Sequence, residues 1–121
     1  RWDIALIDAG RDSISVRFGQ GDGTFRDGTT YSTGERSLPQ TMAKADINHD
    51  SIVDLVVINA GTDTIALFTG LLNGSFVLES TFSTGSGFRP SSITICHLND
   101  DDLLDLAVTN ENSNTLSLFI H

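Results

Sequence analysis

A gapless internal repeat constrains this chain more than any other feature of its sequence. When the sequence is shifted by 51 residues against itself, apolar, turn and acidic positions match without an insertion. The matching segments include Asp3–Gly10, Asp54–Gly61 and Asp105–Asn112, followed by Ser13–Gly19 and Thr64–Gly70. A fixed period of this length is typical of stacked repeats, each of which is one supersecondary unit. Chance alternation of apolar residues would not reproduce the turn positions as well.

Each repeat predicts four short strands and no helix. Apolar and polar residues alternate over 64–69, as in a half-buried strand, whereas Leu55–Ile58 is a continuous apolar run typical of a strand covered on both faces. Residues that tolerate positive φ, such as Gly61 and Asp63, stand at the joints, as hairpins require. In the central repeat the predicted strands are Gln40–Ile47, Asp54–Asn59, Thr64–Thr69 and Ser75–Phe82.

Four antiparallel strands in every repeat predict an all-β fold built from β-propeller blades. We expect a partial blade (strands 2 to 4) over 1–34, a complete blade over 35–85 and a partial blade (strands 1 to 3) over 86–121. These two and a half repeats form an incomplete propeller segment, because propellers close with about four to eight blades. A sandwich of ten strands is the alternative, which the strict repeat register disfavours.

An acidic loop follows the first predicted strand of the central repeat. In Asp46-Ile-Asn-His-Asp-Ser-Ile-Val-Asp54, oxygen-bearing side chains stand at positions 1, 3, 5 and 9. Ca²⁺ binds about six to eight hard oxygen ligands, which a curled loop can supply from alternate residues. The predicted calcium ligands are the side chains of Asp46, Asn48, Asp50 and Asp54 and the main-chain carbonyl of Ile52. The alternative is an acidic turn whose side chains bond their own backbone.

The third repeat carries a second copy of this loop, from His97 to Asp105. The predicted ligands there are the side chains of Asn99, Asp101 and Asp105 and the carbonyl of Leu103. His97 replaces the first carboxylate, and imidazole is a poor ligand for calcium. Asp3 matches the closing Asp of a further loop, whose other ligands would precede Arg1. Neither copy is an EF-hand: the central loop has Ser51 and Val57 where that motif needs Gly and Glu.

The charge balance limits the partners. The chain has 16 acidic and 7 basic residues, with a net charge of −9. It therefore lacks the basic footprint that nucleic acid or an anionic membrane requires, and it contains no apolar run of the ~18 residues that span a membrane.

The single cysteine, Cys96, is expected to be a buried small hydrophobe. No signal peptide is visible, and the start at Arg1 without Met leads us to expect a processed or partial chain.

The D-x-N-x-D-x-x-x-D loop, the D-L-V-V strand after it and the Phe18-Gly19-x-Gly21-x-Gly23-x-Phe25 turn resemble FG-GAP, or VCBS-type, repeats. Such repeats build the seven-bladed propellers of integrin α-subunit heads and of many secreted proteins. The resemblance covers essentially the whole chain and implies an extracellular protein. It implies calcium at the rim of the blade with a mainly structural role. Ser51 and Asp102 stand where the family often has Gly.

Other motifs indicate little chemistry. Gly19, Gly21 and Gly23 join two predicted strands, whereas a dinucleotide fingerprint must open a helix. No nucleophile and base are placed together, so we expect no enzyme. Asn73-Gly-Ser75 is an N-glycosylation sequon in a predicted hairpin, and the first repeat has Asp22 at the matching position.

Two functions remain open from the sequence. The first is a non-catalytic, calcium-stabilised extracellular module for adhesion or for binding a protein or glycan ligand. The second is a structural repeat unit of an extracellular fibre or surface coat. Because incomplete blades expose unpaired backbone, we expect the partners to include further repeats of a longer chain or other copies of this one.

Overall fold

The structure, a computed structural model, describes residues 2–120. In these residues the chain forms a series of short antiparallel strands joined by tight turns. The elements are β1 (Ile4–Asp8), η1 (Ala9–Arg11), β2 (Ser13–Gly19), β3 (Phe25–Ser32), β4 (Pro39–Ala45), β5 (Asp54–Asn59), β6 (Thr64–Gly70), β7 (Phe76–Ser83), β8 (Pro90–Cys96), β9 (Asp105–Asn110) and β10 (Thr115–Phe119). The 3₁₀ turn η1 is the one helical element here, and no helix is long and apolar enough to cross a membrane.

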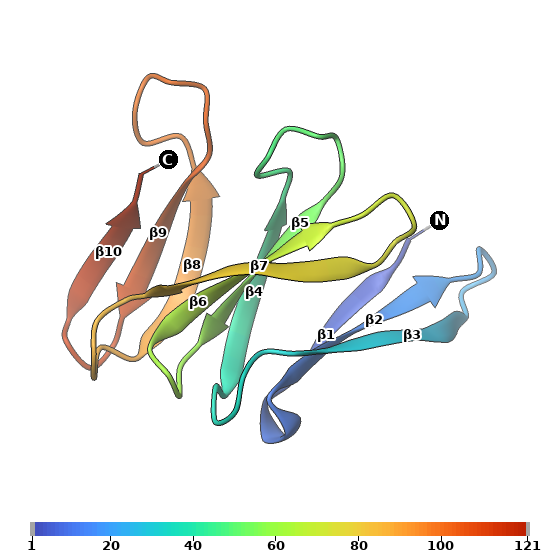
Figure 1. Cartoon of the computed structure of the whole chain (residues 1–121), viewed down its shortest axis with the longest axis horizontal. Helices are drawn as coiled ribbons and strands as arrows, with labels where there is room; N and C mark the ends of the chain where they lie inside the picture. Colours follow the sequence, from blue (N-terminus) through green and yellow to red (C-terminus); the bar gives the residue numbers. More distant parts are fainter. Residues whose placement is uncertain (1, 121) are drawn as a thin grey trace.

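The strands form three sheets, one from each repeat (Figure 1). Sheet A is ordered β1-β2-β3, sheet B is ordered β4-β5-β6-β7, and sheet C is ordered β8-β9-β10. Every hydrogen-bonded neighbour is also a neighbour along the chain, so each sheet is an antiparallel meander. The all-β, four-stranded repeat is thus confirmed and the ten-stranded sandwich is not observed. The sheets of residues 2–120 do not close into a ring.

The first strand of each acidic repeat is shorter than predicted. β4 ends at Ala45, whereas the sequence pattern extended it to Ile47, and the matching strand β8 ends likewise at Cys96. The reason is a change of hydrogen-bond partner: the Ile47 N–H donates to Asp54 Oδ2 at 2.8 Å, and the Leu98 N–H donates to Asp105 Oδ2 at 2.8 Å. These amides therefore leave the ladder and begin the loop.

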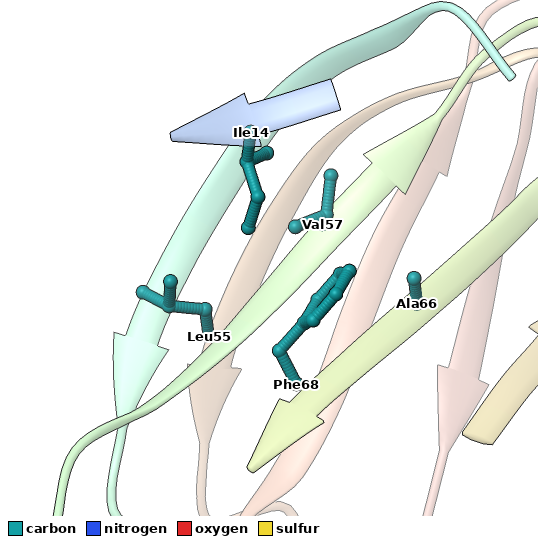
Figure 2. Close-up of a cluster of buried hydrophobic side chains, with 5 residues drawn as sticks. All are labelled: Ile14, Leu55, Val57, Ala66 and Phe68. Carbon is teal, nitrogen blue, oxygen red and sulfur yellow. The ribbon is translucent and has the colours of Figure 1, made fainter. Parts of the chain in front are cut away.

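Sheet B lies between the other two sheets, and its strand β5 is buried along its whole length. Alternate residues of a strand point to opposite faces, so Leu55 and Val57 pack toward sheet A while Val56 and Ile58 pack toward sheet C. The sequence prediction of a strand covered on both faces is confirmed. Figure 2 shows the first of these cores, formed by Ile14, Leu55, Val57, Ala66 and Phe68.

The two packed interfaces differ at their aromatic residues. Between sheets A and B, the Tyr31 ring meets Phe68 at 6.1 Å and Phe76 at 5.9 Å between ring centroids, both edge-on. Between sheets B and C, Phe82 meets Phe119 at 6.2 Å. Cys96, at the end of β8, is half-buried rather than fully buried as the sequence suggested.

Candidate metal centre

The loop between β4 and β5 brings its first three predicted ligands together. One oxygen of Asp46 accepts the Asp50 N–H at 3.0 Å, and the other accepts the Ser51 N–H at 2.8 Å. The Asn48 amide Nδ2 donates to Asp50 Oδ2 at 3.0 Å. Asp46, Asn48 and Asp50 thus share one hydrogen-bonded network within the loop.

Left-handed backbone allows the loop to curl so tightly. His49 has φ 60° and Ser51 has φ 68°, and Asp102 in the second loop has φ 60°. Glycine adopts this conformation without a steric penalty from Cβ, which accounts for the Gly that the family resemblance leads one to expect at the positions of Ser51 and Asp102. The Asp50 carboxylate holds the turn by accepting the Ile52 N–H at 2.8 Å.

Asp54 has a second role that the sequence did not reveal. Its carboxylate is buried, with the residue 1% exposed, and it accepts the Ile47 N–H at 2.8 Å through Oδ2 and the Gly70 N–H at 2.9 Å through Oδ1. It therefore ties the start of β5 to the loop and to the end of β6. Asp3 makes the second of these two contacts in the first repeat, where its Oδ1 accepts the Gly19 N–H at 2.9 Å at the end of β2.

The second loop has a different arrangement at its first position. His97 Nδ1 lies 2.9 Å from the carbonyl oxygen of Leu103, the oxygen predicted as a ligand. Since a neutral carbonyl can only accept, the ring nitrogen donates. Asp101 accepts the Leu103 N–H at 3.0 Å, and Asp105 is fully buried at the start of β9. His97 thus hydrogen-bonds to the Leu103 carbonyl oxygen, which calcium would need as a ligand.

The donor chemistry of the first loop suits calcium better than that of the second. All its side-chain ligand atoms are carboxylate or amide oxygens, and a carboxylate oxygen that accepts one N–H keeps a second lone pair. Across residues 2–120, however, three or more His, Cys, Asp or Glu side chains do not gather as a metal-holding group. The alternative interpretation, in which the loop's side chains bond their own backbone, describes the hydrogen bonds of both loops.

Two further carboxylates were missed as functional positions by sequence reasoning. Asp12 accepts the N–H groups of Arg36 and Leu38, each at 2.9 Å. Asp63, which is 51 residues later, accepts the N–H groups of Gly87 at 2.8 Å and Arg89 at 2.7 Å. Each carboxylate therefore clamps the segment that leads into the next sheet.

A repeated signal could have found these clamps. Asp12, Asp63 and Asn114 occupy one register position, and all three have left-handed φ angles of 50°, 55° and 53°. Gly or Asn at that position of a hairpin would be enough to allow the left-handed φ. An acidic residue there in two repeats therefore indicated that its carboxylate also accepts hydrogen bonds from another part of the chain.

The predicted glycosylation site lies in the exposed turn between β6 and β7. Asn73 Oδ1 accepts the Ser75 N–H at 3.0 Å and also contacts the Ser75 hydroxyl. The matching turn of the first repeat has the same geometry: Asp22 Oδ1 accepts the Thr24 N–H at 2.9 Å. There the Thr24 side chain and backbone lower the pKa of Asp22 from its ordinary value.

Repeated antiparallel sheets joined by acidic and clamped turns define a repeat protein of the all-β class. The family comparison is more specific: the FG-GAP-like repeat matches residues 1–57 and again residues 46–108. The chain therefore belongs to the FG-GAP-like repeat family, whose members are generally non-catalytic and whose fold is a β-propeller-type repeat module. No curated protein and no solved structure matches it.

Proposed function

We propose that this chain is a non-catalytic extracellular module whose loop Asp46–Asp54 binds Ca²⁺ and whose sheets serve in adhesion or in binding a protein or glycan. The hydrogen-bond network that links Asp46, Asn48 and Asp50 supports this proposal most directly. A bound cation would offset the repulsion between the two carboxylates and fix the loop between β4 and β5. The acidic surface, with net charge −9, disfavours nucleic acid as the partner.

Thermal unfolding in excess calcium and in chelator tests the metal. A ligand that binds only the folded state stabilises it by about 2.7 kcal/mol at a free concentration 100 times Kd. We expect a higher Tm in calcium for the natural chain and no calcium response for Asp50→Ala. Asp22→Ala is the matched control, because it removes one exposed carboxylate outside both loops and should keep the response. Equal melting of the natural chain in calcium and chelator would refute the site.

The second loop offers a gain-of-function variant. His97→Asp restores the carboxylate at the first position and releases the Leu103 carbonyl from the ring nitrogen. We expect this variant to show a larger calcium-induced rise in Tm than the natural chain. An unchanged response would show that the second loop takes no part in calcium binding.

Glycosylation of Asn73 belongs to the same proposal, because it requires passage through a eukaryotic secretory pathway. Expression of the chain behind a secretion signal should give a product that a glycosidase converts to lower mass. Asn73→Gln should abolish that shift, and Asp22→Asn should add a second glycan in the matching turn. A product of unmodified mass would remove the site.

A structural repeat unit of a fibre or surface coat is the second candidate. The observation that favours it is apolar exposure on the outward faces of the two terminal sheets. On sheet C, Leu116 and Leu118 are 57% and 53% exposed, and on sheet A, Leu6 is 41% exposed. Such faces could pack against other copies or against further repeats of a longer chain.

A further inference from the structure

The turn between β6 and β7 contains the one asparagine of the chain that a glycine follows. Asn73 is exposed there, and Gly74 has a left-handed φ of 85°. In such a pair the backbone nitrogen of the glycine can attack the side-chain amide carbon of the asparagine, because glycine has no Cβ to hinder the approach. The turn therefore holds an electrophile and a nucleophile in adjacent residues.

Hydrogen bonds of the turn prepare the side-chain amide for this attack. Asn73 Oδ1 accepts the Ser75 N–H at 3.0 Å and also contacts the Ser75 hydroxyl. Both donors stabilise the negative charge that develops on Oδ1 when a nucleophile adds to the amide carbon. The Gly74 N–H donates to the Leu71 carbonyl at 3.0 Å, so this bond has to open before the nitrogen loses its proton. In an exposed turn such opening is a local fluctuation of low cost.

The matching turn of the first repeat has the same geometry around a different reactive group. Asp22 Oδ1 accepts the Thr24 N–H at 2.9 Å, and Gly23 has φ 92°. The side-chain and main-chain hydrogen bonds of Thr24 lower the pKa of Asp22. Its carboxylate is therefore ionised at neutral pH, and an ionised carboxylate resists nucleophilic attack. This turn also shows that an aspartate fits the position without a change of hydrogen bonding.

We propose that Asn73 is a site of spontaneous deamidation, in which the Gly74 nitrogen displaces ammonia from the side chain. The nitrogen forms a bond to Asn73 Cγ while the bond from Cγ to Nδ2 breaks. The proton of the nitrogen passes through water to the departing NH₂ group, which leaves as ammonia. Water then opens the succinimide ring at either carbonyl. The products are aspartate, which keeps the original backbone, and isoaspartate, in which the backbone runs through the former side chain.

The two products have different consequences for the hairpin. Aspartate reproduces the turn of the first repeat and removes the glycan acceptor, because an N-linked glycan requires the asparagine amide. Isoaspartate adds one methylene to the main chain inside the turn that joins Gly70 to Phe76, which are paired residues of the β6–β7 ladder. The reaction uses no ligand of the acidic loops and needs no glycan, so it is independent of the function proposed above.

Peptide mass mapping of the chain made in the bacterial cytosol, where Asn73 carries no glycan, tests the proposal. The internal control is Asn112, an exposed turn asparagine that is followed by Ser113. During incubation at neutral pH we expect Asn73 to be converted to the acid at least about tenfold faster than Asn112. The rate should rise with pH, because the attacking nitrogen must lose its proton. Both aspartate and isoaspartate should form, since direct hydrolysis of the amide gives aspartate alone.

Three variants test the contribution of the turn. Asp22→Asn places an amide in the matching turn, so position 22 should be converted within about threefold of the rate at Asn73. Ser75→Ala removes the hydroxyl donor and keeps the main-chain donor, so it should slow the reaction at Asn73 about two- to fivefold. Asn73→Gln should abolish the reaction at position 73, because the longer side chain cannot close the same ring.

The outcomes separate the mechanism from its alternatives. The proposal is overturned if Asn73 is converted no faster than Asn112, or if aspartate forms without isoaspartate. It is overturned as well if Asp22→Asn leaves position 22 unmodified, because the matched turn would then not confer reactivity. Asp22 and Asn73 are both exposed, so their substitutions should leave the fold intact.

Discussion

At the scale of single residues, substitution of Asp54 distinguishes the stability that its hydrogen bonds give the fold from the stability that a bound metal would add. Its two oxygens accept one backbone N–H each, and the residue is buried. A hydrogen bond to a charged group contributes about 1.5–3 kcal/mol, and a buried unpaired N–H costs about 1–3 kcal/mol. We therefore expect Asp54→Ala to lower the free energy of unfolding by about 3–5 kcal/mol in urea titrations, with a large loss even in chelator.

Asp54→Asn is the control for this prediction. The amide has one oxygen, so it satisfies one of the two N–H groups and should lose about half as much. Asp50→Ala, by contrast, affects a more exposed carboxylate and should act mainly on the calcium response. If Asp54→Ala destabilised the chain only in calcium, the tether to Ile47 and Gly70 would be unimportant.

Sequence alone could locate the acidic loops but not the partners of their residues. The positions of Asp46, Asn48 and Asp50 follow from local spacing, and these residues do share one hydrogen-bond network, in which Asp46 binds the main-chain N–H of Asp50 and Asn48 binds its carboxylate. The bond from Gly70 to Asp54 joins residues 16 apart through a hairpin, and only the folded sheet brings them together. The contact between His97 and the Leu103 carbonyl could not be predicted either, because the spacing of residues along the chain does not determine how the His97 ring is oriented.

At the scale of elements, the clamp by Asp63 fixes how one sheet leads into the next. The two N–H groups that it binds belong to Gly87 and Arg89, just before β8 begins. We expect Asp63→Ala to cost about 1–3 kcal/mol for the lost acceptors, with about 1 kcal/mol more because Ala is strained at φ 55°. Hydrogen exchange at Gly87 and Arg89 should rise, while exchange at Arg36 and Leu38 should not.

Asp63→Gly and Asp63→Asn resolve the two causes. Glycine adopts the left-handed φ without strain but has no acceptor. The glycine variant should therefore be more stable than the alanine variant, with the same rate of amide exchange at Gly87. Asparagine tolerates this φ and keeps one acceptor, so it should lie closest to the natural chain. Unchanged exchange at Gly87 and Arg89 in all three variants would contradict the clamp. Asp12→Ala should repeat the effect before β4.

The elements were more predictable than their connections. Apolar alternation and the Gly, Asn and Asp positions gave the order and approximate bounds of the strands, since both report local backbone preference. The connecting segments carry unusual conformations, with Arg36 at φ 60° and Leu38 at φ 44°. Neither residue type favours such angles, and tertiary hydrogen bonds impose them, so sequence preference could not reveal them.

At the scale of the whole molecule, the packing of the three sheets runs in one direction. Sheet A presents Ile14 to sheet B, and sheet B presents its counterpart Ile65 to sheet C. The next member of this series is Leu116, which is exposed on the outward face of sheet C. On the opposite outward face, Ile4 and Leu6 of sheet A are exposed beside Arg17, which pairs with Asp27 at 3.3 Å.

This direction predicts how copies of the chain would associate with one another. A contact between the outward faces of sheets C and A is head-to-tail, so it should extend into longer assemblies as concentration rises instead of stopping at a dimer. Arg17 stands where sheet B has Phe68, so the contact should be weaker than the packed interfaces. Sedimentation velocity should show species that grow with concentration, and Leu116→Asp or Leu6→Asp should each leave mainly monomers.

Mixing these two variants provides the decisive measurement. The Leu6→Asp chain keeps an intact face on sheet C, and the Leu116→Asp chain keeps an intact face on sheet A. Together they can form one head-to-tail contact and no second, so the mixture should stop at a 1:1 dimer although each variant alone is monomeric. A symmetric contact through sheet C would instead leave Leu6→Asp dimeric by itself, and the mixture would contain no additional species. In that case the order in which sheet A packs on sheet B and sheet B on sheet C would not be repeated between chains.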